Sequence, residues 1–202
     1  MHYALAIMIG FLGLTQGLPL QAQELHWPAD TFQTYTHQPF TLQQIREHPA
    51  TVVLFLDPEC PGTQKYGATL RQLYQKWQKE DVDVVAVYPV VGIDSTAVAE
   101  FATAYHYDFT HVLDPKLRLA RHLQARITPE AYVIDSLGQV RYRGAIDNWF
   151  YELGRYRRVI TEHYVEDVLA AYLTGEPIPV AETEAIGCFI GTGVVEEHHH
   201  KP

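Results

Sequence analysis

The order of apolar and polar positions divides the chain into alternating strand-like and helix-like segments. Short apolar runs rich in β-branched residues predict buried strands at 52–56 and 82–90. Between these runs, apolar residues recur at helical spacing and predict a helix from about 62 to 79. The same patterns predict extended segments around a small hairpin within 23–50, a helix through 98–105, a strand at 109–113, a helix at 116–124, paired strands at 131–135 and 140–143, and a last helix from Thr161 to about Gly175.

This order of elements predicts an α/β fold, in which a central mixed β-sheet is flanked by helices on both faces. A chain of 202 residues is long enough for one such domain with terminal extensions. We therefore expect a leader at 1–22, a folded domain at 23–176 and a loop-like C-terminal tail at 177–202 that carries Cys188.

The leader has the pattern of a signal peptide. The stretch from Ala4 to Leu14 is almost wholly apolar, and Leu20-Gln21-Ala22 supplies a cleavage site of the small-residue type, although no Lys or Arg precedes the apolar run. Export to the periplasm or another extracytoplasmic space follows, with a membrane tether if the segment is not cleaved. A buried N-terminal helix is the alternative.

Charge and cysteine content narrow the range of possible functions. The formal net charge of −9 leaves no basic surplus to neutralise phosphates, which argues against nucleic acid as a partner. The chain has two cysteines, too few for a disulfide scaffold. The core must therefore hold the domain, which leaves the cysteines free for chemistry. No pattern fixes the oligomeric state.

Cys60 is predicted to lie where the strand at 52–56 gives way to a helix, because Pro61 suits the first helical position. The free N–H groups there favour a thiolate, and the Thr63 hydroxyl is placed to donate a hydrogen bond to it. Asp57 and Glu59 oppose a further negative charge. We expect a nucleophile; the alternative is an inert buried cysteine.

Cys188 is the natural resolving partner for Cys60, since a tail can fold back over a site and condense with an oxidised sulfur. A static structural disulfide and an unrelated thiol are the two alternatives. Cys60, Cys188 and His111 would together also make a soft site for copper, but their spacing lacks a compact ligand motif. We expect no cofactor, with copper as the alternative.

The motifs resemble the thioredoxin fold, and within it the redoxins of the alkyl hydroperoxide reductase/thiol-specific antioxidant type, over about residues 35–175. Cys60-Pro61-Gly62-Thr63 stands where such folds place their active cysteine, and Thr128-Pro129 where they have a cis-proline. The resemblance extends to Tyr132–Asp135 with Gly138, to Arg143–Asp147, and to the tail Ala185–Ile190, which is similar to tails of exported peroxiredoxin-like redoxins.

The chain also departs from this family. Thr63 stands where thioredoxins have a second cysteine, and Val53 and Asp57 stand where peroxiredoxins have Pro and Thr. The resemblance implies a thiol-disulfide oxidoreductase or a peroxiredoxin-like peroxidase. Cys60 would attack a peroxide or the disulfide of a partner protein, Pro129 would face it, Cys188 would resolve the intermediate, and an external reductant would reset the pair. A copper-delivery module and a redox-inactive docking domain are the alternatives.

Overall fold

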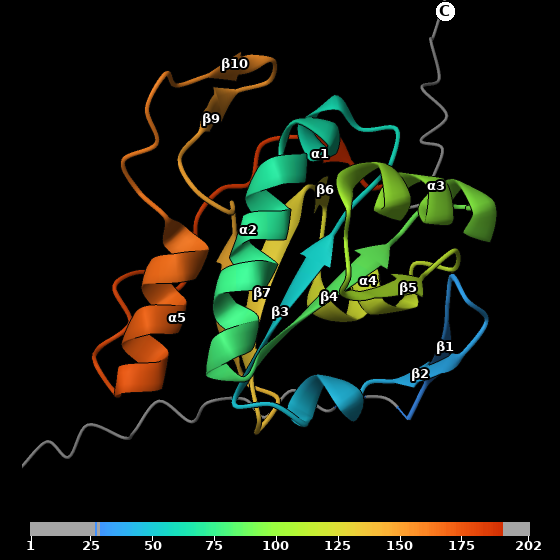
Figure 1. Cartoon of the computed structure of the whole chain (residues 1–202), viewed down its shortest axis with the longest axis horizontal. Helices are drawn as coiled ribbons and strands as arrows, with labels where there is room; N and C mark the ends of the chain where they lie inside the picture. Colours follow the sequence, from blue (N-terminus) through green and yellow to red (C-terminus); the bar gives the residue numbers. More distant parts are fainter. Residues whose placement is uncertain (1–26, 28, 192–202) are drawn as a thin grey trace, which may run out of the picture.

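The computed structural model describes residue 27 and residues 29–191 (Figure 1). The predicted leader at 1–22 and the histidines from His198 to His200 lie outside the described residues. Within the described residues, no helix is both long enough and apolar enough to cross a bilayer.

A mixed sheet of seven strands in the order β2-β1-β5-β4-β3-β7-β8 forms the centre of the fold (Figure 1). Strand β3 runs parallel to β4, and β4 runs parallel to β5, whereas the other pairings are antiparallel. The strands of this sheet are β1 (Thr31–Thr34), β2 (Pro39–Thr41), β3 (Ala50–Phe55), β4 (Val82–Tyr88), β5 (Thr110–Leu113), β7 (Glu130–Asp135) and β8 (Val140–Gly144).

The continuous apolar run of β3 reflects burial on both faces of the sheet. Val52 and Leu54 belong to one hydrophobic core, and Val53 and Phe55 belong to the other. Because successive side chains of a strand point to opposite faces, a central strand covered on both sides is apolar at nearly every position; the exception, Thr51, donates a hydrogen bond to Ile45 O at 2.8 Å. Strand β3 therefore anchors the loop that carries Cys60.

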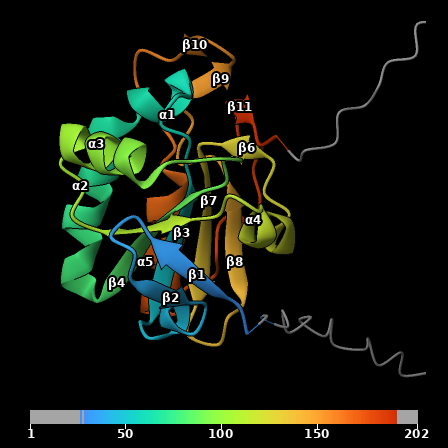
Figure 2. The ribbon, with the colours of Figure 1, turned by 90° about the vertical axis from the view of Figure 1, so that its right-hand side faces the viewer.

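Helices cover both faces of the sheet, as the sequence predicts (Figure 2). Buried residues of α2, α3 and α5 join one core, and those of α4 and η1 join the other. The helices are η1 (Gln44–Arg46), α1 (Pro61–Lys65), α2 (Gly67–Trp77), η2 (Gln78–Glu80), α3 (Ser95–Tyr105), α4 (Arg118–Leu123) and α5 (Tyr164–Thr174).

The helix predicted at 62–79 is interrupted at Tyr66, which separates α1 from α2. Directly after the break, a Cβ on Gly67 would lie 2.0 Å from a ring carbon of Tyr105, so only glycine allows α2 and α3 to approach this closely. The last helix begins at Tyr164 rather than at Thr161, because Thr161 exchanges two hydrogen bonds with Asn148 instead of capping the helix.

Two segments without a regular sequence pattern form short strands. The stretch at 144–158, which no predicted helix or strand covers, contains the hairpin of β9 (Phe150–Glu152) and β10 (Arg155–Tyr156). The tail is not simply loop-like, because β11 (Cys188–Phe189) pairs with β6 (Ile127–Thr128). Both small sheets lie at the end of the molecule that carries α1 (Figures 1 and 2).

Candidate redox site

Cys60 lies between the end of β3 and the first turn of α1, where it is the N-cap residue and Pro61 follows it in the helix. Its backbone N–H donates to Asp57 O at 3.0 Å, and its carbonyl accepts from Gln64 N at 3.0 Å. The side chain is only 2% exposed. The local sequence therefore delivers this sulfur to the buried side of a helix start.

The proline opposite Cys60 is cis, as the resemblance implies. A Cβ on Gly62 would lie 3.2 Å from Pro129 Cδ and 3.5 Å from Cys60 Sγ, which places these three residues in one tight cluster. Thr128 O approaches Cys60 Sγ to 3.1 Å. The cis peptide bond thus joins the two residues that face the cysteine.

Cys60 and Cys188 form a disulfide that spans 128 residues, with their Cα atoms 6.0 Å apart. That separation is ordinary for a disulfide. Cys188 is partly exposed, in contrast to Cys60. The sulfur of Cys188 is therefore the one that an approaching reagent reaches more easily.

The final part of the described tail, residues 184–190, lies along the edge of β6, and we call it the tail strand. Cys188 pairs with Thr128 and Phe189 with Ile127 in antiparallel register. Ile190 N donates to Arg126 O at 2.8 Å. Backbone pairing therefore places Cys188 beside the residue that precedes the cis-proline.

The preceding part, residues 178–183, is fixed independently of the disulfide, and we call it the tail anchor. Thr183 N donates to Arg143 O at 3.1 Å, and Thr183 Oγ1 accepts from Ala145 N at 3.0 Å and contacts Tyr142 Oη at 2.5 Å. Gly144 has a φ of +137°, and a Cβ there would lie 2.3 Å from Thr183 O. Strand β8 and the residue after it therefore form a socket for Thr183.

A groove of about 840 Å³ opens beside the disulfide. Its lining carries both charges, from Arg126 and Arg143 and from Glu130, Glu182 and Glu184, and includes most residues of the tail strand. At its rim, Phe189 is 85% exposed and Leu153 of the β9–β10 hairpin 71% exposed. The residues on either side of Cys188 therefore line an open groove that carries apolar and charged side chains.

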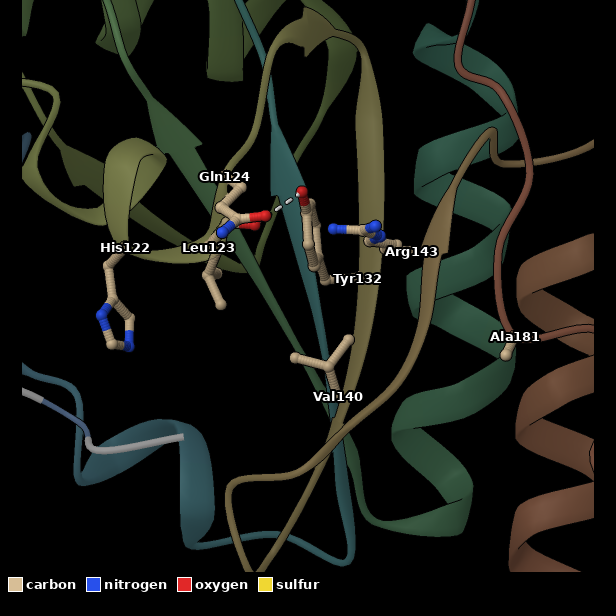
Figure 3. Close-up of a pocket in the computed structure, with 7 residues that line it drawn as sticks. All are labelled: His122, Leu123, Gln124, Tyr132, Val140, Arg143 and Ala181. Atoms are coloured by element: carbon tan, nitrogen blue, oxygen red, sulfur yellow. Dashed lines mark hydrogen bonds between the residues drawn. The ribbon is translucent and has the colours of Figure 1, made fainter. Parts of the chain in front are cut away.

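A smaller pocket of about 310 Å³ lies beside α4 and strands β7 and β8 (Figure 3). Tyr132 donates a hydrogen bond to Leu123 O at 3.1 Å there, and Arg143 lies next to the Tyr132 ring (Figure 3). Neither cysteine lines this pocket.

In the disulfide form, Asp57 and Thr63 make hydrogen bonds within the cysteine loop rather than to Cys60 Sγ. Thr63 is fully buried, and its hydroxyl accepts from Asp57 N at 3.4 Å; within the described residues it makes no hydrogen bond to Cys60. An Asp57 carboxylate oxygen accepts from Glu59 N at 2.9 Å. The predicted hydrogen bond from Thr63 concerns the thiolate and stays a prediction.

Tyr66, at the end of α1, contacts the segment after β8, and sequence patterns did not reveal this contact. Its hydroxyl donates to Asp147 Oδ1 at 2.6 Å, and its ring packs against Trp149 and Phe150. Burial raises the pKa of Asp147, and burial together with the Asp147 carboxylate raises the pKa of Tyr66. This buried pair braces α1 against the base of the β9–β10 hairpin.

His111 belongs to the core of the sheet. It is 1% exposed, its Nδ1 lies 2.8 Å from Tyr88 Oη, and burial lowers its pKa to about 4. Its ring stacks on Tyr107 and Phe109. Across the described residues, no three His, Cys, Asp or Glu side chains gather to hold a metal ion, so His111 does not join the two cysteines in such a group.

Of the predicted site residues, the structure brings Cys60, Pro129 and Cys188 together, and Thr63 lies buried in the same loop. Gly187 and Thr183 are further residues of the site that the sequence did not single out. A Cβ on Gly187 would lie 2.1 Å from Thr128 O. Gly187 could have been recognised from the sequence because it directly precedes Cys188, whereas no neighbouring residue indicated a role for Thr183.

Comparisons with known proteins agree with this geometry. A family model described as the AhpC/TSA family matches residues 23–143. A hypothetical protein from Sinorhizobium meliloti 1021 superposes with a TM-score of 0.71 at 21% identity, over 81% of this chain and 92% of that one. The comparison with curated proteins finds no match.

Two further solved structures share the fold at lower similarity. One is a secreted disulfide oxidoreductase from Mycobacterium tuberculosis that is homologous to DsbE of E. coli, with a TM-score of 0.51 and 17% identity over 73% of this chain and 96% of that one. The other is the peroxidoxin BcpB from the same organism, with a TM-score of 0.50 and 16% identity over 58% of this chain and 80% of that one.

Proposed function

Because the chain belongs to the AhpC/TSA family, whose fold it has, we propose that it is a thiol–disulfide oxidoreductase with Cys60 and Cys188 as its redox pair. The observation that carries the proposal is the disulfide between a cysteine at a helix start and a tail strand paired beside the cis-proline. A tail held in this way supplies the second thiol that the cysteine loop lacks.

The catalytic cycle begins with the reduced protein. The Cys60 thiolate attacks one sulfur of a substrate disulfide, a new S–S bond forms, and the other substrate sulfur leaves as a thiolate. The Cys188 thiolate then attacks Cys60 Sγ, which forms the intramolecular disulfide and releases the substrate as a second thiolate. Two electrons pass from the protein dithiol to the substrate, and protons from solvent complete the thiols.

An external dithiol resets the pair, and burial decides where it attacks. Cys60 is 2% exposed, whereas Cys188 is partly exposed, so the incoming thiolate meets Cys188 Sγ. The S–S bond then breaks with Cys60 as the leaving group, at a helix start where unpaired N–H groups favour a thiolate. A second thiol of the reductant releases Cys188.

Disulfide exchange is favoured over peroxide reduction by the groups that surround the sulfur. In the described part of the chain, the polar atom within hydrogen-bonding distance of Cys60 Sγ is Thr128 O, an acceptor. A carbonyl in this position suits an adjacent strand rather than a peroxide.

The decisive experiment compares three proteins in a stopped-flow assay with a peptide disulfide and with hydrogen peroxide. We expect the reduced wild type to react with the disulfide, Cys60→Ser to be inactive, and Cys188→Ser to accumulate a mixed disulfide visible by mass spectrometry. Full activity of Cys60→Ser would refute the proposal. Preferential reaction with peroxide would assign the chain to the peroxidases instead.

We further propose that the protein acts outside the cytoplasm, after export by the leader at 1–22. The apolar run from Ala4 to Leu14 and the small-residue cleavage site at Leu20-Gln21-Ala22 support this location. N-terminal sequencing of the protein from fractionated cells should find an extracytoplasmic chain that begins at Gln23. A full-length cytoplasmic chain would contradict the proposal.

A further inference from the structure

The tail strand occupies its place on β6 through contacts that another polypeptide can make equally well. The pairing of Cys188 with Thr128 and the hydrogen bond from Ile190 N to Arg126 O involve backbone groups. The remaining links are a hydrogen bond from Thr128 Oγ1 to Cys188 O, the burial of the Ile190 side chain and the disulfide itself. Addition of an extended segment to an exposed strand edge is a general mode of peptide binding, in which side-chain pockets supply selectivity.

The position before the cysteine admits only glycine. A Cβ on Gly187 would lie 2.1 Å from Thr128 O and 2.8 Å from Thr128 C, both of which are backbone atoms that a rotamer change cannot move. Gly62 lies on the other side, since its own Cβ would come within 3.9 Å of Gly187 Cα. A segment with any larger residue there cannot keep this register.

The two positions after the cysteine differ in burial. Phe189 is 85% exposed, whereas Ile190 is 7% exposed and joins the core that contains Leu123 and Ala125. This alternation is the one expected of an added strand. The edge therefore selects an apolar residue two places after the cysteine and ignores the residue between them.

We propose that the substrate of this site is an extended polypeptide with the pattern glycine, cysteine, any residue, apolar residue, and that the tail strand stands in for it between reactions. This proposal rests on the proposed function. The substrate cysteine enters as one half of a disulfide. Its sulfur bonds to Cys60 while the other half leaves as a thiolate.

Substrate and tail strand cannot occupy the edge of β6 together, because both need the backbone groups of Arg126 and Thr128. Reduction frees the tail strand while the tail anchor holds Thr183 in its socket. Return of Cys188 to attack Cys60 Sγ then expels the substrate as a thiolate. Resolution of the mixed disulfide and product release become one event.

The test uses the full chain with Cys188→Ser, so that Cys60 is its only thiol. The probes are synthetic heptapeptides with the sequence of residues 184–190, each with its cysteine linked as a disulfide to thionitrobenzoate, whose release is followed by absorbance. Relative to this peptide, we expect the one with Ala before the cysteine to react about tenfold or more slowly, as loss of register and pairing requires. A peptide with Ser in place of the apolar last residue should also react more slowly.

The matched control replaces the residue between cysteine and apolar residue, and here the rate should not change. A second variant, Gly187→Ala combined with Cys188→Ser, prevents the tail from docking and should accelerate the reaction of the parent peptide with Cys60. Equal rates for all peptides, with oxidised glutathione also reacting, would overturn the sequence pattern and leave the proposed function standing. No reaction of Cys60 with any disulfide would overturn both.

Discussion

The tail anchor and the tail strand follow each other in sequence but are held in different ways. The anchor is fixed by a hydrogen bond from Ala145 N to Thr183 Oγ1, by another from Thr183 N to Arg143 O, and by packing of Ile178 and Val180 against the core. The strand is held by the pairing of its two-residue β11, by the hydrogen bond and burial of Ile190, and by one disulfide. The first set of contacts does not depend on redox state, and the second does.

This difference shows how a cysteine distant in sequence can act as a local one. Once Thr183 is fixed, only residues 184–187 separate it from Cys188. A short tether keeps the thiol at a high effective concentration near its target after the disulfide has opened. The tail anchor therefore sets how fast the Cys60–Cys188 disulfide forms again. The tail strand determines whether the β6 edge is free while the disulfide is reduced.

The largest effect is expected from Cys188→Ser under oxidising conditions. Loss of a disulfide that closes a loop of 128 residues should lower the free energy of unfolding by about 3–5 kcal/mol, because the unfolded chain regains freedom. Urea unfolding monitored by circular dichroism measures this loss. In dithiothreitol, the wild type and the variant should unfold alike; a difference there would mean that the strand is held without its disulfide.

Thr183→Val tests the anchor. The change removes the acceptor of Ala145 N and the partner of Tyr142 Oη, and should cost about 1–3 kcal/mol of stability in the reduced protein. With the tether loosened, the ratio of oxidised to reduced protein in a glutathione buffer should fall about tenfold. Thr183→Ser keeps the hydroxyl and should restore both values, whereas an unchanged ratio in the valine variant would separate the anchor from the chemistry.

The sequence predicted the cysteine loop and the return of Cys188 to it, but missed the strand that the tail forms, for the same physical reason. The β3 strand, the turn and the start of α1 are each encoded by adjacent residues, so the position of Cys60 followed from its neighbours. The cis-proline followed from the family resemblance. Local patterns carry these features because the interactions that form them are local.

The tail depends on interactions between distant residues. Strand β11 has two residues, too few for any periodicity, and its partner Thr128 lies 60 positions earlier. The need for glycine at Gly187 arises from the carbonyl of Thr128, and the place of Thr183 arises from the positive φ of Gly144. None of these constraints is visible from the tail sequence alone, which therefore predicted a loop.

Glu130→Gln tests whether the surface that receives the tail strand is itself rigid. Glu130 Oε2 accepts from Arg126 N at 2.9 Å and Ile127 N at 3.4 Å, and burial raises the pKa of this carboxyl above its ordinary value of 4.5. The folded protein therefore binds the proton more tightly than the unfolded chain, so this group's contribution to stability falls as pH rises from about 4.5 through the folded pKa.

The glutamine variant cannot ionise and should lack this decline. Urea unfolding should therefore show that raising the pH from 4 to 7 lowers the free energy of unfolding more in the wild type than in Glu130→Gln. The difference should be the same in oxidised and reduced protein if the β6 edge keeps its shape when the tail strand leaves. If the wild type and Glu130→Gln differ in only one redox state, the β6 edge changes its shape when the tail strand leaves.

The smallest effect is expected from Glu182→Gln in the tail anchor. Glu182 pairs with Arg143 at 2.9 Å, but the two side chains are 61% and 39% exposed, and exposed ion pairs contribute at most about 1 kcal/mol. We expect a loss of a few tenths of a kcal/mol in low salt that disappears near 1 M salt, where screening is strong. The glutathione equilibrium of the disulfide should barely move, because the Thr183 socket remains. A shift as large as that of Thr183→Val would show that charge, rather than the buried hydroxyl, positions the tail.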